Sequence, residues 1–267
     1  MMDASRLSFL GARGLARLRD ARIAVVGAGG GGSHIVQQLA HLAVAHLHVV
    51  DPDDVERSNV NRLVGATYHD VARNKATVLA ERFAALGGSL YPTVGRAEED
   101  GVRSLLQTCD LVFGAVDRYR ARDNLERICR TALVPYIDIG LTIVLSRRGA
   151  VDGIGGQIVS SVPGGPCLRC LGVVTDENIA RDREGYVAGD PEPQVVSMNG
   201  LLASQAVTGA LALLTSFTGN FLLPPHLIYD GLEHTLRPNA FTPEGLCPHY
   251  PLAEAGWRYV LQVKHPS

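Results

Sequence analysis

Short apolar runs alternate with segments of helical periodicity in the first half of the chain. Residues 23–26 form an apolar run that stops at glycine, and apolar residues then recur at helical spacing from residue 35 to residue 42. A second apolar run, residues 47–50, ends at Asp51. This order predicts a strand, a glycine turn, a helix and a second parallel strand with an acid at its tip, which is a βαβ unit.

The alternation continues to residue 139. The predicted helices are residues 75–85, 101–107 and 123–131, and the predicted strands are residues 90–94, 111–115 and 135–139. Strands that alternate with helices in this way are typical of an open sheet with helices on both faces. We therefore expect a Rossmann-like α/β fold with a doubly wound, mostly parallel sheet.

The pattern changes after Gly140. Residues 141–145 and 156–162 have no helix between them, so we expect a hairpin that extends the sheet with antiparallel strands. Two further strands are predicted near the carboxyl terminus, at residues 226–229 and 257–263.

Two long segments between these strands differ in polarity. Residues 175–193 are polar and charged and contain Gly and Pro, which predicts a mobile crossover or lid within a crossover loop at about residues 171–197. Residues 198–217 are almost wholly apolar. Polar residues such as Asn199 and Gln205 interrupt this run and no polybasic anchor flanks it, so a buried helix or a dimer contact is favoured over a membrane span.

The composition is that of a globular protein. Hydrophobic residues make up 46% of the 267 residues and charged residues 19%, which excludes disorder as the main state. The net charge of −2 offers no large positive field for a nucleic-acid backbone or an anionic membrane. The Arg-rich amino terminus lacks the apolar stretch of a signal peptide. We expect a soluble, cytoplasmic protein that binds neither a membrane nor a nucleic acid.

A run of glycines separates the first strand from the first helix. Residues 27–32, Gly-Ala-Gly-Gly-Gly-Gly, let the backbone approach a polyphosphate, and the helix amino terminus adds amide donors. Asp51 stands 19 residues beyond Gly32, at a strand end where a carboxylate can accept hydrogen bonds from ribose hydroxyls. By themselves these residues fit a dehydrogenase that binds a dinucleotide equally well.

Four polar residues farther along the chain favour triphosphate chemistry. Asn59, Arg62 and Lys75 would put an amide and two cations near the nucleotide, more positive charge than a nicotinamide cofactor needs. Such cations neutralise the charge that builds up in the transition state of nucleotidyl transfer. Asp117 follows the fourth predicted strand, on the ligand-binding edge, and is a candidate Mg²⁺ ligand. Taken singly, Arg62 and Lys75 also fit solvated surface positions.

Four runs, in this order, carry a family resemblance: RIAVVGAGGGGS, VVDPDDVERSNVNR, NK and GAVD. They resemble the ThiF/MoeB/HesA family of ubiquitin-activating-type adenylyltransferases over about residues 6–217. The resemblance implies ATP- and Mg²⁺-dependent adenylation of the C-terminal glycine carboxylate of a small ubiquitin-like or sulfur-carrier protein, by a homodimer. It implies an adenylation domain, residues 1–217, and a carboxyl-terminal extension, residues 218–267, that packs on a zinc site.

The resemblance also implies roles for individual residues. It places Gly27, Gly29, Gly30 and Gly32 at the phosphates and Asp51 at the ribose. It places Asn59, Arg62 and Lys75 along the triphosphate, and it makes Asp117 a ligand of the magnesium. Among these, Arg62, Lys75 and Asp117 would be catalytic. Arg122 corresponds to a family arginine near the site. An amino-terminal arginine, Arg6 or Arg13, would reach into the site of the other subunit.

Five cysteines, two of them in a Cys-x-x-Cys, indicate metal or redox chemistry. Cys167 and Cys170 resemble the first half of the family's structural zinc site. Cys247 and His249 would complete a Cys₃His tetrahedron, or another residue would take the place of His249. The Pro-Gly-Gly-Pro turn before Cys167 is unlike the strand-to-helix junction of a thioredoxin-like redox site.

Residues 171–193 contain no cysteine, whereas relatives that go on to a thioester or persulfide commonly keep one there. We therefore expect the chain to stop at the adenylate and to pass it to a separate sulfur donor or acceptor. Two alternatives remain open. The same chemistry could activate another carboxylate or amide, on a small molecule or a modified tRNA, as in related threonylcarbamoyladenosine dehydratases. Alternatively, the chain could be a nucleotide-binding scaffold without activity. The intact set of Asp51, Arg62, Lys75 and Asp117 argues against a scaffold, because binding alone does not need these residues.

Overall fold

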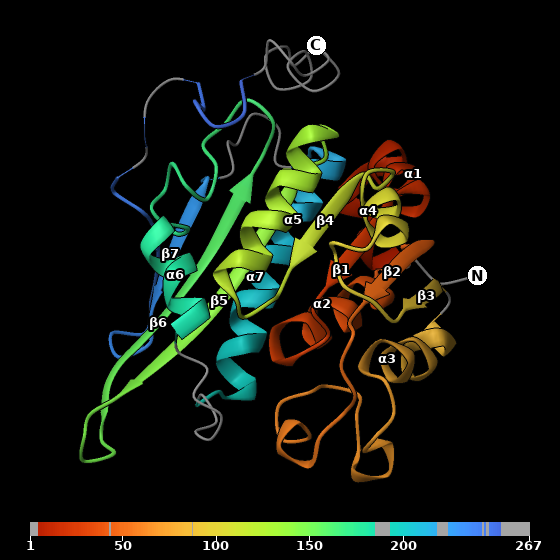
Figure 1. Cartoon of the computed structure of the whole chain (residues 1–267). Helices are drawn as coiled ribbons and strands as arrows, with labels where there is room; N and C mark the ends of the chain where they lie inside the picture. Colours follow the sequence, from red (N-terminus) through yellow and green to blue (C-terminus); the bar gives the residue numbers. More distant parts are fainter. Residues whose placement is uncertain are drawn as a thin grey trace.

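An eight-stranded mixed sheet organises the chain (Figure 1). The structure, a computed structural model, describes residues 5–42, 44–86, 88–184, 193–217, 224–241, 243 and 246–251. The strands are β1 Arg22–Val26, β2 His46–Val50, β3 Ser89–Thr93, β4 Leu111–Gly114, β5 Tyr136–Leu145, β6 Val151–Ser161, β7 His226–Asp230 and β8 Thr235–Pro238. Their order in the sheet is β3-β2-β1-β4-β5-β6-β7-β8. Neighbours from β3 to β5 are parallel and neighbours from β5 to β8 are antiparallel, which confirms the predicted fold class.

Helices cover both faces of this sheet. The α-helices are α1 Gly11–Asp20, α2 Gly30–His41, α3 Lys75–Phe83, α4 Asp100–Leu106, α5 Tyr119–Thr131, α6 Asp176–Glu184 and α7 Val196–Thr215. The 3-10 helices are η1 Ser5–Leu10, η2 Arg57–Asn59, η3 Tyr68–Asp70 and η4 Ala84–Leu86.

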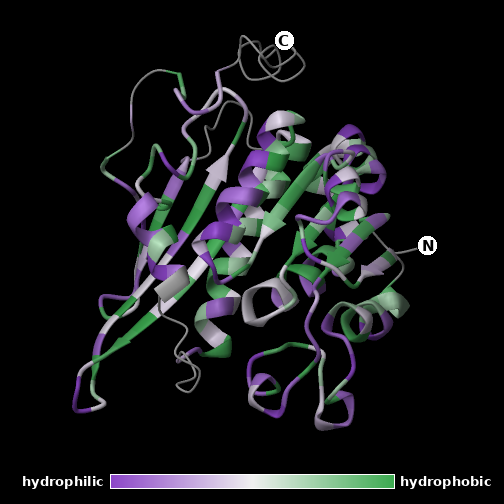
Figure 2. Ribbon diagram, in the orientation of Figure 1, coloured by the Kyte–Doolittle hydropathy of each residue, from purple (hydrophilic) through white to green (hydrophobic). Residues whose placement is uncertain are grey.

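The sheet separates two hydrophobic cores. Along β1, Ile23 and Val25 point into a core shared with α1, α2, α3 and α7, whereas Ala24 and Val26 point into a core shared with α4 and α5. Side chains on a strand alternate between its faces, so β1 needs apolar residues at every position. In Figure 2 the central strands are correspondingly hydrophobic, while polar residues cover much of α5.

Several elements differ from the prediction. The predicted strands 135–139 and 141–145 are one strand, β5, because Gly140 continues the extended backbone. A Cβ at Gly140 would lie 2.4 Å from Arg122 Nη2, so this glycine makes room for an arginine rather than ending a strand. Two α-helices and one strand are additional to the predicted ones: α1, β8, and α6, which lies inside the predicted crossover. The predicted strand 257–263 lies outside the described residues.

Helix α7 packs on the sheet beside two other helices. It contacts β5 and β6 as well as α1 and α2, and it buries Leu202, Ala203 and Ala206. Within the described part of the chain, α7 is the helix long and apolar enough to cross a membrane. One face of α7 is buried in the core, whereas other positions face outward, such as Leu201, which is 40% exposed. The predicted dimer contact stays a prediction.

Both outer strands of the sheet carry a proline, Pro92 in β3 and Pro238 in β8. In β3, the Ser89 N–H donates to the Ala45 carbonyl just before β2, and the Thr93 carbonyl accepts from the Asp51 N–H just after β2. Alternate residues of a strand direct their backbone groups to opposite sides, so the backbone nitrogen of residue 92 points away from β2. In β8, Asn239 donates its N–H to β7, so residue 238 also faces outward. Each proline therefore occupies a position whose N–H would have pointed away from the sheet, and it removes no ladder hydrogen bond.

Candidate functional site

The glycine run forms a tight turn between β1 and α2. Gly27 has a φ of +93°, and a Cβ on it would lie 2.3 Å from the Ala115 carbonyl oxygen. A Cβ on Gly32 would lie 1.7 Å from the Gly27 carbonyl oxygen. A Cβ on Gly29, in contrast, would meet no other atom of the described residues within 4 Å. The turn needs Gly27 and Gly32 for its own shape, while Gly29 borders open space before the helix amino terminus, where anions bind favourably.

Asp51 holds this turn from the end of β2. Its Oδ2 accepts the Ala28 N–H at 2.6 Å, and its Oδ1 accepts the Asp53 N–H at 2.8 Å. The residue is buried, and burial raises its pKa, although the Ala28 amide and the charge of Lys75 act in the opposite direction. Each carboxylate oxygen keeps a second lone pair, so the bonds within the protein leave capacity for a ribose hydroxyl. The ribose contact stays a prediction.

Helix α3 begins beside Asp51. Asn74 caps this helix, since its Oδ1 accepts the Thr77 N–H at 3.1 Å while its Nδ2 donates to the Asp51 carbonyl at 3.0 Å. The Lys75 side chain is 13% exposed, and its Nζ lies 3.3 Å from Asp53 Oδ2. The structure thus brings Lys75 and Asp51 to the same side of the glycine turn. Asn74 is a positioning residue that sequence reasoning missed, although its place before a helix is a recognised capping signal.

Asn59 and Arg62 lie on the loop that contains η2. The Asn59 side chain closes the capping box of η2 and is nearly buried. Arg62 Nη1 donates to the Ser58 carbonyl at 2.7 Å. The loop is tied to the first turns of α2, where Ser33 Oγ accepts the Val64 N–H at 3.0 Å. These bonds are local, so the structure places both residues on a loop anchored to α2, with no direct contact shown between them and the glycine turn.

Asp117 is exposed on the loop after β4, and the buried Arg122 supports that loop from α5. Arg122 Nε donates to the carbonyl of Val116, the residue before Asp117, at 3.1 Å. Its Nη1 pairs with Asp138 Oδ2 at 2.9 Å. The Tyr136 hydroxyl donates to the other oxygen of Asp138 at 2.8 Å. Arg122 therefore positions the Asp117 loop and ties α5 to β5.

Sequence reasoning missed Tyr136 and Asp138 as supports of this loop. Both lie on the α5 face of β5, and Asp138 is fully buried there. A charged residue inside an otherwise apolar strand is the signal that could have identified it, because such a residue is almost never buried without a partner.

Helix α7 closes the glycine turn from the other side. A Cβ on Gly30 would lie 2.5 Å from the Asn199 amide nitrogen, so the Asn199 side chain occupies the space that this glycine leaves. His34 Nε2 lies 3.1 Å from the Val196 carbonyl oxygen, and burial lowers the pKa of His34. Asn199 enters the sequence analysis only as a polar interruption of an apolar helix.

The amino-terminal arginines lie far from this turn. Arg6 and Arg13 are exposed on η1 and α1. A Cβ on Gly14 of α1 would contact Thr215, the last residue of α7, whereas Asn199 at the other end of α7 contacts the glycine turn. The helix between these two contacts is roughly 24 Å long, at 1.5 Å per residue. In one chain, therefore, α1 and the glycine turn lie at opposite ends of α7.

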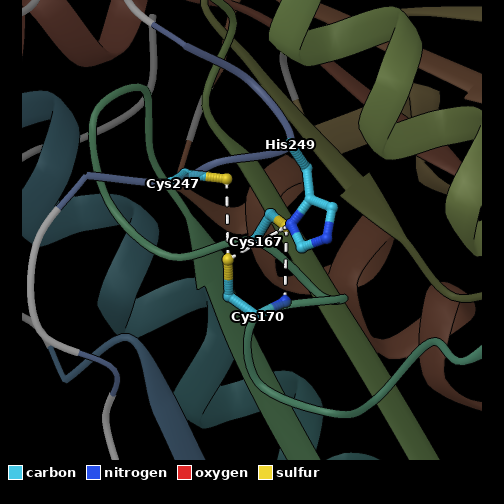
Figure 3. A group of neighbouring side chains, drawn as sticks. All are labelled: Cys167, Cys170, Cys247 and His249. Carbon is cyan, nitrogen blue, oxygen red and sulfur yellow. Dashed lines mark hydrogen bonds between the residues drawn. The ribbon is translucent and has the colours of Figure 1, made fainter.

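A second cluster joins the loop after β6 to the carboxyl-terminal segment (Figure 3). The ligand atoms of Cys167, Cys170, Cys247 and His249 all lie within 4.8 Å of one another. His249 Nδ1 lies 3.4 Å from the sulfurs of both Cys167 and Cys170, and the Cys170 sulfur lies 3.6 Å from those of Cys167 and Cys247. The structure thus brings together all four residues of the predicted Cys₃His set.

These distances can be compared with a zinc tetrahedron. Zn–S bonds of about 2.3 Å and Zn–N bonds of about 2.0 Å give edges of about 3.8 Å between sulfurs and about 3.5 Å between sulfur and nitrogen. The cluster therefore has the dimensions of such a site. Burial raises the pKa of the Cys167 thiol, and a bound cation would lower it again.

Buried charges on α5 hold the loop that carries Cys167. Arg130 donates to the carbonyls of Val162 at 2.6 Å and Gly165 at 2.9 Å. Glu126 accepts the Leu168 N–H at 2.9 Å, and burial raises the pKa of Glu126 to about 7. Helix α5 therefore supports the Asp117 loop at one end and the cysteine cluster at the other.

The chain matches known proteins over most of its length. It matches the ThiF family over residues 3–248. A protein of Thermus thermophilus, named sulfur carrier protein adenylyltransferase, is 30% identical over 254 residues, which are 90% of this chain and 85% of the relative. The SAMP-activating enzyme E1 of Haloferax volcanii is 36% identical over 164 residues, which are 61% of this chain and only 57% of that protein.

The fold is shared with a solved structure. The crystal structure of Escherichia coli MccB with succinimide superposes with a TM-score of 0.73 at 19% identity, covering 92% of this chain and 72% of that one. An identity this low shows the fold alone. The match over residues 3–248 and the 30% identity to a relative over 90% of the chain go further. The chain belongs to the ThiF family.

Proposed function

We propose that this chain is an ATP- and Mg²⁺-dependent adenylyltransferase that activates the C-terminal glycine carboxylate of a ubiquitin-like or sulfur-carrier protein. The observation that carries the proposal is the open space at Gly29, just before the first amides of α2. Asp51 and Lys75 lie at the same turn and would supply a ribose acceptor and a positive charge. Membership of the ThiF family and the name of the Thermus thermophilus relative support the same activity.

The reaction joins the substrate to AMP. A carboxylate oxygen attacks the α-phosphorus of ATP, the bond from this phosphorus to pyrophosphate breaks, and pyrophosphate leaves with the electron pair. Because the attacking carboxylate is already ionised near pH 7, the step needs no general base. The α2 amino terminus, Lys75 and Arg62 would neutralise the charge that develops on the phosphates. Asp117 would hold Mg²⁺, which supplies further positive charge when it is bound.

Cys167, Cys170, Cys247 and His249 are proposed to hold one structural Zn²⁺. Support comes from their mutual distances, which match a zinc tetrahedron, and from the donor set, because three sulfurs and one imidazole are typical zinc ligands. The metal would fasten the carboxyl-terminal segment to the loop after β6, so its contribution is to the stability of the fold.

The working unit is proposed to be a cytoplasmic homodimer in which Arg6 or Arg13 completes the site of the other copy. The position of α1 supports this arrangement, since α1 and the glycine turn contact opposite ends of α7 within one chain. An arginine acting from a second copy would add positive charge where the α-phosphorus is attacked.

The test is ATP–pyrophosphate exchange against a panel of purified carrier proteins ending in Gly-Gly. We expect exchange that requires one of these carriers and disappears when the carrier's terminal carboxylate is amidated. Exchange supported instead by a small-molecule carboxylate or by a tRNA would overturn the carrier assignment. Since residues 171–193 lack cysteine, the carrier adenylate should accumulate as the product, with no thioester to the chain detectable under non-reducing conditions.

A further inference from the structure

Helix α5 begins without a capping side chain of its own. Its N-cap residue is Arg118, the residue after Asp117, and the side chain at this position does not cap the helix. An arginine side chain carries only donors, so it cannot accept the N–H groups that the first turn of a helix leaves unpaired. The first turn of α5 therefore needs an acceptor from another part of the chain.

The acceptor comes from α6, which packs against α5 (Figure 1). Asp182 Oδ2 accepts the Arg120 N–H at 2.8 Å. Arg120 is the second residue of α5, where a capping side chain normally binds, and a carboxylate there also lies at the positive end of the helix dipole. Asp182 thus caps α5 from a position 62 residues farther along the chain.

Arg169 holds α6 in the place that this cap requires. Its Nε and Nη2 donate to the two carboxylate oxygens of Asp123 on α5, at 2.8 and 3.2 Å. Its Nη1 donates to Asp176, the first residue of α6, at 2.9 Å. Two N–H groups on one carboxylate fix the orientation of a guanidinium. Helices α5 and α6 are therefore joined at two places, through Arg169 and through Asp182.

The cap lies next to the candidate magnesium ligand. Asp117 stands two residues before the first residue of α5, so its loop and the first turn of the helix are one short stretch of backbone. Arg122 holds this stretch before Asp117, at the Val116 carbonyl. Asp182 holds it after Asp117, at the second residue of α5. The backbone around Asp117 is thus fixed on both sides, and one of the two contacts comes from α6.

We propose that Asp182 is a positioning residue for magnesium binding, which acts by capping α5 and so holds the backbone of Asp117 in place. The proposal rests on the proposed function, because it takes Asp117 as the residue that holds Mg²⁺. Asp182 itself would touch neither the nucleotide nor the metal. The magnesium site is then complete only while α6 is packed against α5.

The first experiment measures the cap without any ligand. Hydrogen–deuterium exchange of the full chain is followed by mass spectrometry on peptides that cover residues 115–122. We expect about fivefold faster exchange in Asp182→Ala, which corresponds to the roughly 1 kcal/mol of a lost capping bond. Asp182→Asn keeps a carbonyl oxygen that can accept the same N–H, so its exchange should stay close to that of the wild type. Equal exchange in Asp182→Ala and the wild type would overturn the proposal.

The matched control for this experiment is Glu177→Ala. It removes another carboxylate of α6, one whose side chain is 74% exposed and pairs with Arg181 of the same helix. Exchange over residues 115–122 should not change in this variant. A rise equal to that of Asp182→Ala would show that the charge of α6, rather than the cap, protects the segment, and would refute the role of Asp182.

The second experiment measures the magnesium requirement of ATP–pyrophosphate exchange. If a lost cap leaves the Asp117 backbone in place only part of the time, the apparent affinity for Mg²⁺ falls by that fraction. Asp182→Ala should therefore raise the free Mg²⁺ concentration for half-maximal exchange about threefold to fivefold, with the carrier KM unchanged and with rescue in Asp182→Asn. A higher carrier KM with an unchanged magnesium requirement would mean that Asp182 contacts the substrate, and would overturn the positioning role.

A binding measurement separates this proposal from the proposed function. Hydrogen–deuterium exchange over residues 115–122 is recorded as Mg²⁺ is added to the chain with ATP and without a carrier. We expect protection that needs a higher Mg²⁺ concentration in Asp182→Ala than in the wild type. Equal protection curves refute the role of Asp182, even with carrier-dependent activity intact, and so does a wild type that Mg²⁺ leaves unprotected. Different curves without activity toward any carrier refute the adenylyltransferase and retain the positioning role.

Discussion

The glycines of the turn differ in what a side chain at each position would contact. Gly32 approaches a carbonyl oxygen of the turn itself, whereas Gly29 faces space that no described atom fills. The first constraint belongs to folding and the second to ligand binding. Two neighbouring substitutions should therefore have opposite consequences for stability and for nucleotide binding.

We expect Gly32→Ala to lower the free energy of unfolding by about 3 kcal/mol or more, because its Cβ would overlap a backbone oxygen. Gly29→Ala should stay within about 1 kcal/mol of the wild type, since its φ of −79° suits alanine. The Gly29 variant should nevertheless lose ATP affinity, because its methyl group enters the space proposed for the phosphates. Urea unfolding and calorimetric titration with ATP measure the two quantities. Wild-type affinity in folded Gly29→Ala would place the phosphates elsewhere.

Asp117 can be tested without disturbing the fold, since its side chain is exposed. If it holds Mg²⁺, Asp117→Ala should reduce carrier-dependent exchange at least about a hundredfold while the melting temperature stays the same. Asp100→Ala, which removes an exposed carboxylate at the start of α4, is the matched control and should keep full activity. Undiminished exchange in the Asp117 variant would remove this residue from the mechanism.

Helix α5 connects two sites that the sequence treats as separate. Its first turn carries Arg122, which supports the Asp117 loop, and its later turns carry Glu126 and Arg130, which hold the loop of Cys167. The side chains that make these connections are charged and buried, so each depends on its partner.

The variant Arg122→Met should cost about 3–5 kcal/mol in unfolding free energy, because it leaves the Asp138 charge buried without its partner. Adding Asp138→Leu should recover most of this loss, since a buried pair can often be replaced by apolar residues. Arg127→Met, an exposed position on the same helix, should change stability by less than about 0.5 kcal/mol. Equal losses for the single and double variants would show that Arg122 is important for packing rather than for pairing.

The metal proposal makes a prediction for the complete chain. Purified protein should contain about one Zn²⁺ per chain, and a chelator should lower the melting temperature because the metal would hold the carboxyl-terminal segment. Cys247→Ser should lower it similarly, with no further effect of chelator and with unchanged ATP affinity. Metal-free protein with a disulfide between Cys167 and Cys170 would support the redox alternative.

The dimer proposal is tested by mixing inactive chains. Asp117→Ala and Arg6→Ala protein should each be inactive alone, and a mixture should regain activity because one site of a mixed dimer has both residues. Failure of the mixture in a dimer proven by light scattering would exclude Arg6, and Arg13 would then be exchanged in the same design. A fully active monomer at micromolar concentration would refute the dimer.

The sequence predicted the parts whose signal is local. The apolar run of β1, the glycine turn and the periodicity of α2 adjoin each other, so their order alone indicates the unit they form. Helix α1 was not predicted because its ten residues include three arginines, and because its buried Leu18 belongs to a core that α7, from a distant part of the chain, helps to form. Strand β5 was divided at Gly140 because the reason for that glycine, the Arg122 side chain, comes from a distant part of the chain.

In the candidate site, too, residues with a local sequence signal were predicted and residues that depend on long-range contacts were not. Residues within recognisable runs, such as Lys75 and Asp117, could be named from spacing, whereas Asn199 and Asp138 depend on contacts between α7 or α5 and the sheet.

The outward-facing prolines of β3 and β8 limit how copies of this protein can associate. A sheet grows by accepting a new strand along an edge, and each new strand needs the N–H groups that the edge presents. Pro92 and Pro238 interrupt that row at the two ends of the sheet, so edge-to-edge polymerisation is discouraged on both sides. Association through helices and the faces of the sheet is favoured instead, which permits a closed pair of chains and protects against open-ended fibres.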